Sequence, residues 1–208
     1  MAVRGIGPEL GCALLTVECQ NGVINPEFRG HDGLAGQAEK RGIVEKIADL
    51  ADVCRAAGFP VFHNKLTHRP DWLGSGVNSS LLGSNRKRRT MLLGTPDVDL
   101  HPGLRAHPED FQLERITGVT SFYASPLDQL LRNCGVRTVI LTGVSTNLGI
   151  PGAAIEAVNR GYNVVIPEDC TAGVWTEAHE FAVQYTLPPL AAMTTSEELT
   201  GAIEALKG

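Results

Sequence analysis

Residues 136–151 read VRTVILTGVSTNLGIP, and this stretch does most to decide the fold. Its first six residues are mainly apolar and β-branched, which is typical of a strand buried on both faces in a parallel sheet. Polar and small residues follow at 143–149, and residues 146–160 have a helical pattern with Pro151 in the first turn, where a missing N–H costs little. A buried strand that runs straight into a helix is the repeating unit of α/β folds.

The rest of the chain repeats this alternation. Further strands are predicted at residues 12–17, 60–64, 111–116, 162–166 and 190–194, and further helices at residues 38–57, 127–134, 176–186 and 196–206. Alternating elements with short connections favour one central, mostly parallel sheet of about six strands with helices on both faces. The sequence therefore predicts a Rossmann-like, three-layer α/β/α sandwich, and its length suits a single domain over residues 1–208.

Two segments interrupt the pattern. Residues 23–36 are rich in Gly, Pro and Asn and are predicted to form a loop. Residues 65–110 hold most of the Pro, Gly, Ser and basic residues. Because a long excursion inside a compact domain usually has a function, we expect residues 65–110 to fold over the site.

Charge and cysteine content exclude several classes of protein. The chain carries a net charge of −5, so nucleic acid is not expected as a partner, because phosphate binding needs a basic field. The basic run at residues 86–89 is interpreted as a solvated loop or helix end in preference to a phosphate site. Five scattered cysteines without a CxxC pair indicate neither a zinc site nor a disulfide framework.

Several sequence patterns do not occur, and their absence sets the expectations for localisation and cofactors. Residues 1–11 have no apolar leader, and no apolar run approaches the roughly 18 residues that span a membrane. A cytoplasmic protein without a membrane partner is therefore expected. No nucleotide-binding or metalloprotease motif occurs, so no cofactor is expected. His63 and His68 lie five residues apart, a spacing that does not guarantee convergent ligands, so no metal is expected.

In a parallel sheet, sites lie beyond the carboxyl ends of the strands. Glu18 follows the strand at residues 12–17, where burial would raise its pKa and suit it to acid–base chemistry. The alternative is a carboxylate that caps a loop or pairs with an arginine. The turn at 143–149 either faces a ligand or is an ordinary strand–helix turn, in which Thr146 or Asn147 caps the helix. The residues expected to contact a substrate are Asn21, His68, Arg69, Phe122, Tyr123, Ser145, Thr146 and Asn147.

Four segments resemble the isochorismatase-like hydrolases of the cysteine hydrolase superfamily. Residues 13–21, ALLTVECQN, look like the first-strand signature of that family, ALLVIDMQN. Residues 120–127, 136–150 and 161–172 look like three further family segments, and the four occur in the family's order over nearly the whole chain. The resemblance implies the same α/β/α fold, a small-molecule substrate, and a cis bond between Val144 and Ser145.

The family's usual catalytic triad is Asp, Lys and Cys, and its thiolate attacks amide-type bonds. The resemblance places Glu18 at the Asp position, Ile116 at or near the Lys position and Gly149 at the Cys position. Arg115 is expected on the opposite face if Ile116 faces the site, because strand side chains alternate. Gly149 has no side chain and cannot serve as a nucleophile. Cys19, Cys134 and Cys170 are interpreted as buried structural cysteines.

Two functions remain open. The isochorismatases themselves have glycine at the Cys position, and the resemblance implies that their first-strand acid protonates a vinyl ether, which water then attacks. We therefore expect an isochorismatase-like hydrolase of a small molecule, in which Glu18 activates water or protonates a vinyl ether. The alternative is an inactive member that binds a metabolite or a protein partner in the retained pocket.

A homo-oligomer, either a dimer or a tetramer, is also expected, with Ala153, Ala154 and Ala157 available for close helix packing.

Overall fold

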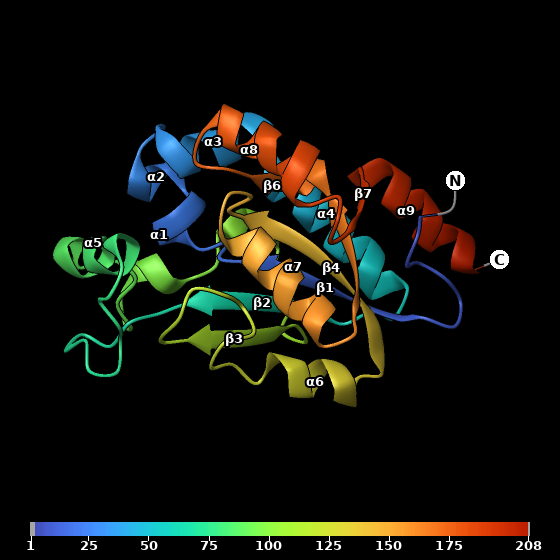
Figure 1. Cartoon of the computed structure of the whole chain (residues 1–208), viewed down its shortest axis with the longest axis horizontal. Coiled ribbons are helices and arrows are strands. Elements are labelled where there is room, and N and C mark those ends of the chain that lie inside the picture. The colour runs from blue at the N-terminus through green and yellow to red at the C-terminus, as the bar shows by residue number, and fades with distance from the viewer. Residues whose placement is uncertain (1–2, 208) are drawn as a thin grey trace.

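A parallel sheet forms the middle layer of the structure, a computed structural model that describes residues 3–207 (Figure 1). Its strands are β1 (Gly11–Val17), β2 (Val61–Leu66), β3 (Phe111–Arg115), β4 (Val136–Val144), β5 (Asn163–Pro167), β6 (Thr171–Ala172) and β7 (Ala192–Thr194). Six of them follow the order β3-β2-β1-β4-β5-β7, β6 pairs with the end of β4, and all pairs are parallel. The predicted mostly parallel sheet is confirmed.

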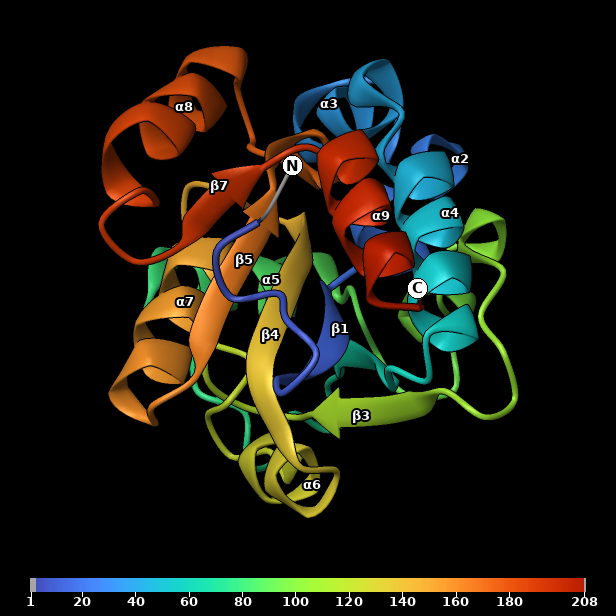
Figure 2. The ribbon, with the colours of Figure 1, turned by 90° about the vertical axis from the view of Figure 1, so that its right-hand side faces the viewer.

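Helices cover both faces of the sheet (Figure 2). Helices α4 (Ile43–Ala56) and α9 (Ser196–Glu204) lie on one face, and α6 (Leu127–Asn133) and α7 (Gly149–Asn159) lie on the other. Helix α8 (Thr176–Phe181) continues into a π-helical turn, Ala182–Thr186. Among the described residues, no helix has the length and apolar character that crossing a membrane requires.

Strand β1 shows why its sequence is apolar at nearly every position. Ala13, Leu15 and Val17 belong to the core beneath α6 and α7. Cys12 and Leu14 belong to the core beneath α4 and α9. Because successive side chains of a strand point to opposite faces, a strand covered on both sides needs apolar residues without a break.

The alanine face of α7 is part of the first core. Ala153, Ala154 and Ala157 are fully buried against the sheet of their own chain. Small side chains let the helix approach the strands closely. This face is therefore not available to a second copy, and the alanines do not support the expected oligomer.

Two segments differ from the sequence prediction. The single helix predicted at 38–57 is two helices, α3 (Gly33–Arg41) and α4, because Gly42 adopts a left-handed conformation (φ 62°) that ends α3. The predicted loop at 23–36 contains α1 (Asn21–Ile24), α2 (Pro26–Arg29) and the start of α3. Asn25 caps α2 by accepting the N–H of Glu27, a signal that was present in the sequence. The 65–110 excursion contains α5 (Ser80–Arg88), and the basic run stands at the end of this helix, as its interpretation as a solvated loop or helix end allowed.

A buried polar network joins β1, β2, α4 and the loop before β3. Thr16 Oγ1 lies 2.8 Å from His63 Nδ1, and His63 Nε2 lies 3.0 Å from Asp110 Oδ2. Arg55 donates two hydrogen bonds to the Asp110 carboxylate, and the N–H of His107 donates a third. Burial alone would raise the pKa of Asp110, but the bonds from His63, Arg55 and His107 outweigh it and hold the pKa well below its usual range.

We expect Asp110→Asn to lower the free energy of unfolding by about 2 kcal/mol at neutral pH, because the amide leaves buried donors without an acceptor. A carboxyl with a depressed folded-state pKa stabilises the fold above its unfolded pKa and loses that contribution as the pH falls. The wild type should therefore lose its advantage over the variant between about pH 5 and pH 2. Urea unfolding at several pH values measures this, with exposed Asp32→Asn as the control. A stability difference that does not change with pH would contradict the prediction.

Candidate active site

A cavity of about 360 Å³ opens at the carboxyl ends of the central strands. Glu18, directly after β1, Arg115, at the end of β3, and Gly149, the first residue of α7, all line it. Residues from α1, α2, α3 and α5 and from the loops around them line the rest of it. The 65–110 excursion therefore folds over the site, as expected.

Glu18 has an unusual backbone for a residue other than glycine. Its φ of 52° is left-handed, a conformation that costs about 1–3 kcal/mol and that clusters at functional sites. The N–H of Glu18 donates to the carbonyl of Asn64 across the sheet, 2.9 Å away. The Glu18 side chain is 20% exposed, so its carboxyl can meet a bound molecule although it is largely surrounded by protein.

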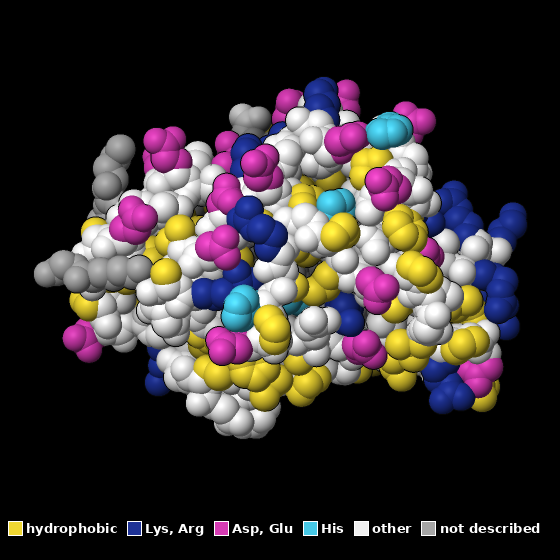
Figure 3. Space-filling view, turned by 180° about the vertical axis from the view of Figure 1, so that it is seen from behind, with side chains coloured by type: hydrophobic (Ala, Val, Ile, Leu, Met, Phe, Trp, Pro, Cys, Tyr) yellow, Lys and Arg dark blue, Asp and Glu magenta, His cyan; other side chains and the backbone are white. Residues whose placement is uncertain are grey.

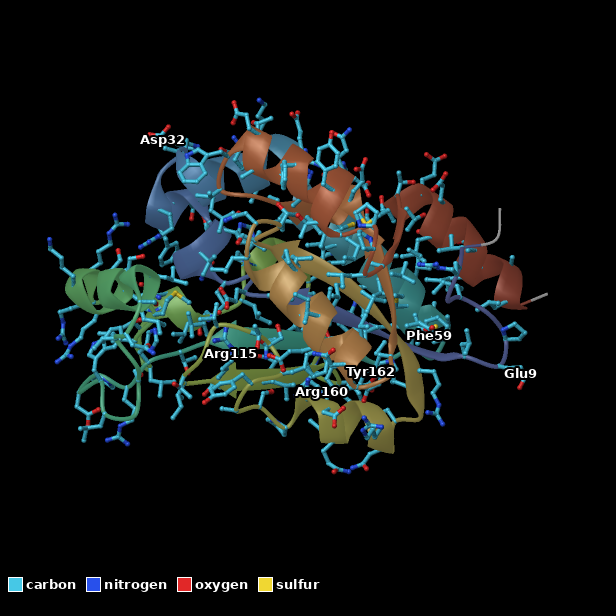
Figure 4. The ribbon with its side chains drawn as sticks, viewed as in Figure 1. Glu9, Asp32, Phe59, Arg115, Arg160 and Tyr162 are labelled. Carbon is cyan, nitrogen blue, oxygen red and sulfur yellow. The ribbon has the colours of Figure 1, made fainter. Side chains whose placement is uncertain are left out.

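Arg115 holds the Glu18 carboxyl. Its guanidinium is fully buried and Nη2 donates to Glu18 Oε1, while Nη1 donates to the carbonyl of Gly118. Figure 4 shows Arg115 in the middle of the molecule. Burial raises the pKa of Glu18 above its ordinary value, and the charge and hydrogen bond of Arg115 offset this only in part. The carboxyl is therefore poised to hold a proton at a higher pH than an exposed glutamic acid would.

The prediction for Arg115 and Ile116 was wrong. Leu113 and Arg115 are both buried on the same face of β3, so alternation brings Arg115, rather than Ile116, to Glu18. Ile116 lies beyond the last strand residue, its side chain is 40% exposed, and it does not line the cavity. Its carbonyl accepts the hydroxyl of Ser75 instead.

Gly149 is the first residue of α7 and packs closely against the end of β4. A Cβ at this position would lie 2.8 Å from the carbonyl oxygen of Val144 and 3.6 Å from Val17 Cγ1. Its N–H belongs to the first turn of a helix and has no acceptor within that helix. Ser145 also lines the cavity, and the Val144–Ser145 peptide bond is cis, as the resemblance implied.

Neither predicted helix cap is formed. Leu148 occupies the cap position of α7 without a side-chain hydrogen bond. Thr146 is buried, with Oγ1 3.1 Å from Nδ1 of His179. Asn147 accepts the N–H of Val174. Thr146 and Asn147 therefore fix the turn, and neither lines the cavity.

The other predicted contact residues lie outside the cavity lining. Asn21 donates to the carbonyl of Pro96, and Arg69 is exposed and paired with Asp71. His68 is buried and stacked on a tryptophan, and burial lowers its pKa.

The two aromatic residues of the 120–127 segment divide between core and surface. Phe122 packs in the core beneath α7, whereas Tyr123 is 57% exposed. Neither Phe122 nor Tyr123 lines the cavity, so their predicted contact with a substrate is not supported.

No cysteine lines the cavity among the described residues. Cys19 and Cys170 are fully buried, and burial raises the pKa of both thiols far above the ordinary value. Cys134 is exposed, contrary to the prediction, because it follows the last residue of α6. The described residues also contain no group of three or more His, Cys, Asp or Glu side chains arranged to hold a metal ion.

Sequence reasoning missed the outer walls of the cavity. They come from short helices and include Arg29 of α2, Leu34 of α3, and Leu82, Asn85 and Arg88 of α5. The basic run at 86–89 was a partial signal. Nothing in its spacing, however, indicated that only Arg88 of that run would reach the cavity.

Comparison with known proteins identifies relatives of this chain. The family model described as the isochorismatase domain matches residues 12–198. The chain is 27% identical over 198 residues to the uncharacterized isochorismatase family protein YecD of Escherichia coli O157:H7, covering 92% of this chain and 95% of YecD. It is 30% identical over 140 residues to Nicotinamidase 3 of Arabidopsis thaliana, covering 66% and 68% of the two chains. A solved cysteine hydrolase from Pseudomonas syringae pv. phaseolicola 1448A has the same fold, with a TM-score of 0.83, 23% identity, and coverage of 99% and 98%.

Proposed function

Because the chain belongs to the isochorismatase family, we propose that it hydrolyses a small molecule without a thiol nucleophile and that Glu18 is its acid–base group. One observation carries the proposal. The Glu18 carboxyl lines the cavity with Arg115 bonded to it, while no cysteine does so among the described residues. Acid–base chemistry is thus available at a position where thiol chemistry is not.

Gly149 supports a reaction in which water is the nucleophile. It stands where the resemblance places the family's cysteine, and glycine offers no side chain to attack a substrate. Gly149 lines the same cavity as Glu18 and Ser145, and this cavity of about 360 Å³ has room for water beside a small ligand. Water can enter such a space and reach a substrate that Glu18 has protonated.

A vinyl ether, or a bond of similar lability, fits this site best. Glu18 transfers its proton to the vinyl carbon, and the electron pair of the double bond forms the new C–H bond, which leaves an oxocarbenium ion. Water adds to the cationic carbon and returns a proton to the Glu18 carboxylate. The hemiketal then collapses to a ketone and an alcohol. Arg115 stabilises the carboxylate in the interval between the two proton transfers.

Amide hydrolysis is the reaction named in Nicotinamidase 3, and it makes a different demand. An amide needs a strong nucleophile at the carbonyl carbon as well as a proton on the leaving nitrogen. Glu18 would have to serve as base and then as acid, with no covalent intermediate to divide the barrier. The raised pKa of Glu18 favours its protonated form and therefore favours proton donation first.

The pH profile of turnover is expected to report Glu18. Because the protonated acid is the active form, kcat should be constant at low pH and should fall about tenfold per pH unit above the pKa of Glu18. The descending limb should lie above the range of an ordinary glutamic acid, since burial raises this pKa. A rate that rises with pH over the same range would contradict the acid role.

Mass-spectrometric turnover of vinyl ethers, amides and ureas, including isochorismate, tests the function.

The alternative is an inactive member that binds a metabolite or a protein partner in the cavity. The observation that favours it is the hydrogen bond from Arg115 to Glu18, which occupies one carboxyl oxygen. Under this alternative the same panel yields no product, while ligands still stabilise the fold against heat.

A further inference from the structure

The charge of the cavity differs in sign from the charge of the chain. Three arginines and two carboxylates line the cavity, a formal charge of +1, although the whole chain carries −5. Arg115 donates directly to the Glu18 carboxyl, so its guanidinium is already engaged. The remaining charged lining residues are Arg29, Arg88 and Asp32.

Arg29 and Arg88 are free to bind a ligand. Arg29 is the last residue of α2 and Arg88 the last residue of α5, and Figure 1 shows both helices at the same end of the molecule. Both side chains are exposed, and among the described residues no carboxylate lies within 4.0 Å of either guanidinium. Basic side chains also gather at this end in the space-filling view, at the right-hand edge of Figure 3.

The uncharged part of the cavity lining is mainly apolar and includes Leu34, Leu82 and Met91. Asn85 and Thr90 add an amide and a hydroxyl. Asp32 is the one lining carboxylate that would repel an anion. It is exposed, and Figure 4 shows it at the outer edge of the molecule.

We propose that Arg29 and Arg88 form an anion-binding subsite at the mouth of the cavity, and that the substrate is a carboxylate on an apolar body. The apolar body lies along Leu34, Leu82 and Met91, which directs the far end of the molecule to Glu18. That the bound molecule is a substrate rests on the proposed function. The subsite itself requires only that a ligand binds. Arginine suits the role because its guanidinium can donate two parallel hydrogen bonds to one carboxylate.

Matched pairs of a carboxylate and its neutral amide test the subsite. Calorimetric titration of the full chain would compare benzoate with benzamide, phenylacetate with phenylacetamide, and cinnamate with cinnamamide. We expect the carboxylate of the best-fitting pair to bind about tenfold more tightly than its amide. Arg88→Gln should remove most of that preference, and Arg29→Gln/Arg88→Gln should remove all of it, with little change in amide binding.

Arg86→Gln is the matched control, since Arg86 is exposed on the same helix and does not line the cavity. It should leave the preference unchanged. Equal binding of carboxylate and amide in all three pairs would overturn the subsite, and so would a preference that survives in the double variant.

Titration of Glu18→Gln separates this inference from the proposed function. The subsite requires that the carboxylate preference persists in Glu18→Gln, whether or not the wild type turns anything over. A wild type that prefers carboxylates and hydrolyses nothing would overturn the hydrolase and keep the subsite. A wild type that hydrolyses neutral molecules and their carboxylate counterparts at equal rates would keep the hydrolase and overturn the subsite.

Discussion

Replacing Glu18 with glutamine is expected to lower turnover by about a thousandfold and to leave the fold intact. The loss is large because positioned general acids contribute about 10²–10⁴ to rates, and an amide has no proton of suitable acidity to transfer. The fold should survive because glutamine has the same shape and its amide oxygen can still accept the hydrogen bond from Arg115. Glutamine removes the counter-charge of the buried Arg115 guanidinium, so a loss of free energy of unfolding is expected, although the variant should still fold.

The control for this variant is Glu177→Gln, which changes an exposed glutamate in the first turn of α8. Circular dichroism and thermal unfolding would establish that both variants are folded, and product formation from the small-molecule panel would give their rates. Unchanged turnover in folded Glu18→Gln would remove Glu18 from the mechanism.

Replacing Arg115 with methionine is expected to lower the free energy of unfolding by about 3–5 kcal/mol at pH 8. Removal of one member of a buried ion pair leaves the other charge without compensation. Arg115 is fully buried, and it is the partner that opposes the burial-induced rise in the pKa of Glu18. Without it, the Glu18 carboxylate is either buried unpaired or neutralised at a cost in free energy.

The effect should depend on pH with a definite sign. A carboxyl whose folded-state pKa is raised destabilises the fold only above its unfolded pKa, which is about 4.3 for glutamic acid. The loss in Arg115→Met should therefore be larger at pH 8 than at pH 4, as urea unfolding would measure. In the double variant with Glu18→Gln, no charge is left to bury, and at least about 1 kcal/mol of the loss should be recovered. Additive effects of the two changes would show that the pair is not coupled.

The central part of the fold could be predicted because local signals and tertiary packing agree there. The apolar runs of β1 and β4 are covered by helices on both faces, and each run leads into a residue that lines the cavity, Glu18 or Gly149. The outer segments could not be predicted as well. Gly42 interrupts a continuous apolar pattern by its backbone conformation alone, which periodicity does not reveal.

The partner of Glu18 was missed for a simple geometric reason. Adjacent strand residues face opposite sides, so an error of one position exchanged Arg115 for Ile116 and moved the charge out of the site. The strand end at Arg115 could not be located from sequence to one residue. Arg29 and Arg88 were missed because they reach the cavity from short helices whose placement depends on tertiary contacts.

The exposure of Cys134 has a practical consequence. The other four thiols are buried, and burial raises the pKa of each, so Cys134 is the one cysteine among the described residues that a maleimide dye should label readily. It lies just before β4 begins, at the opposite edge of the sheet from the cavity. A fluorophore attached there would leave the mouth of the cavity open. The native chain can thus be immobilised or tracked in single-molecule experiments without an engineered tag.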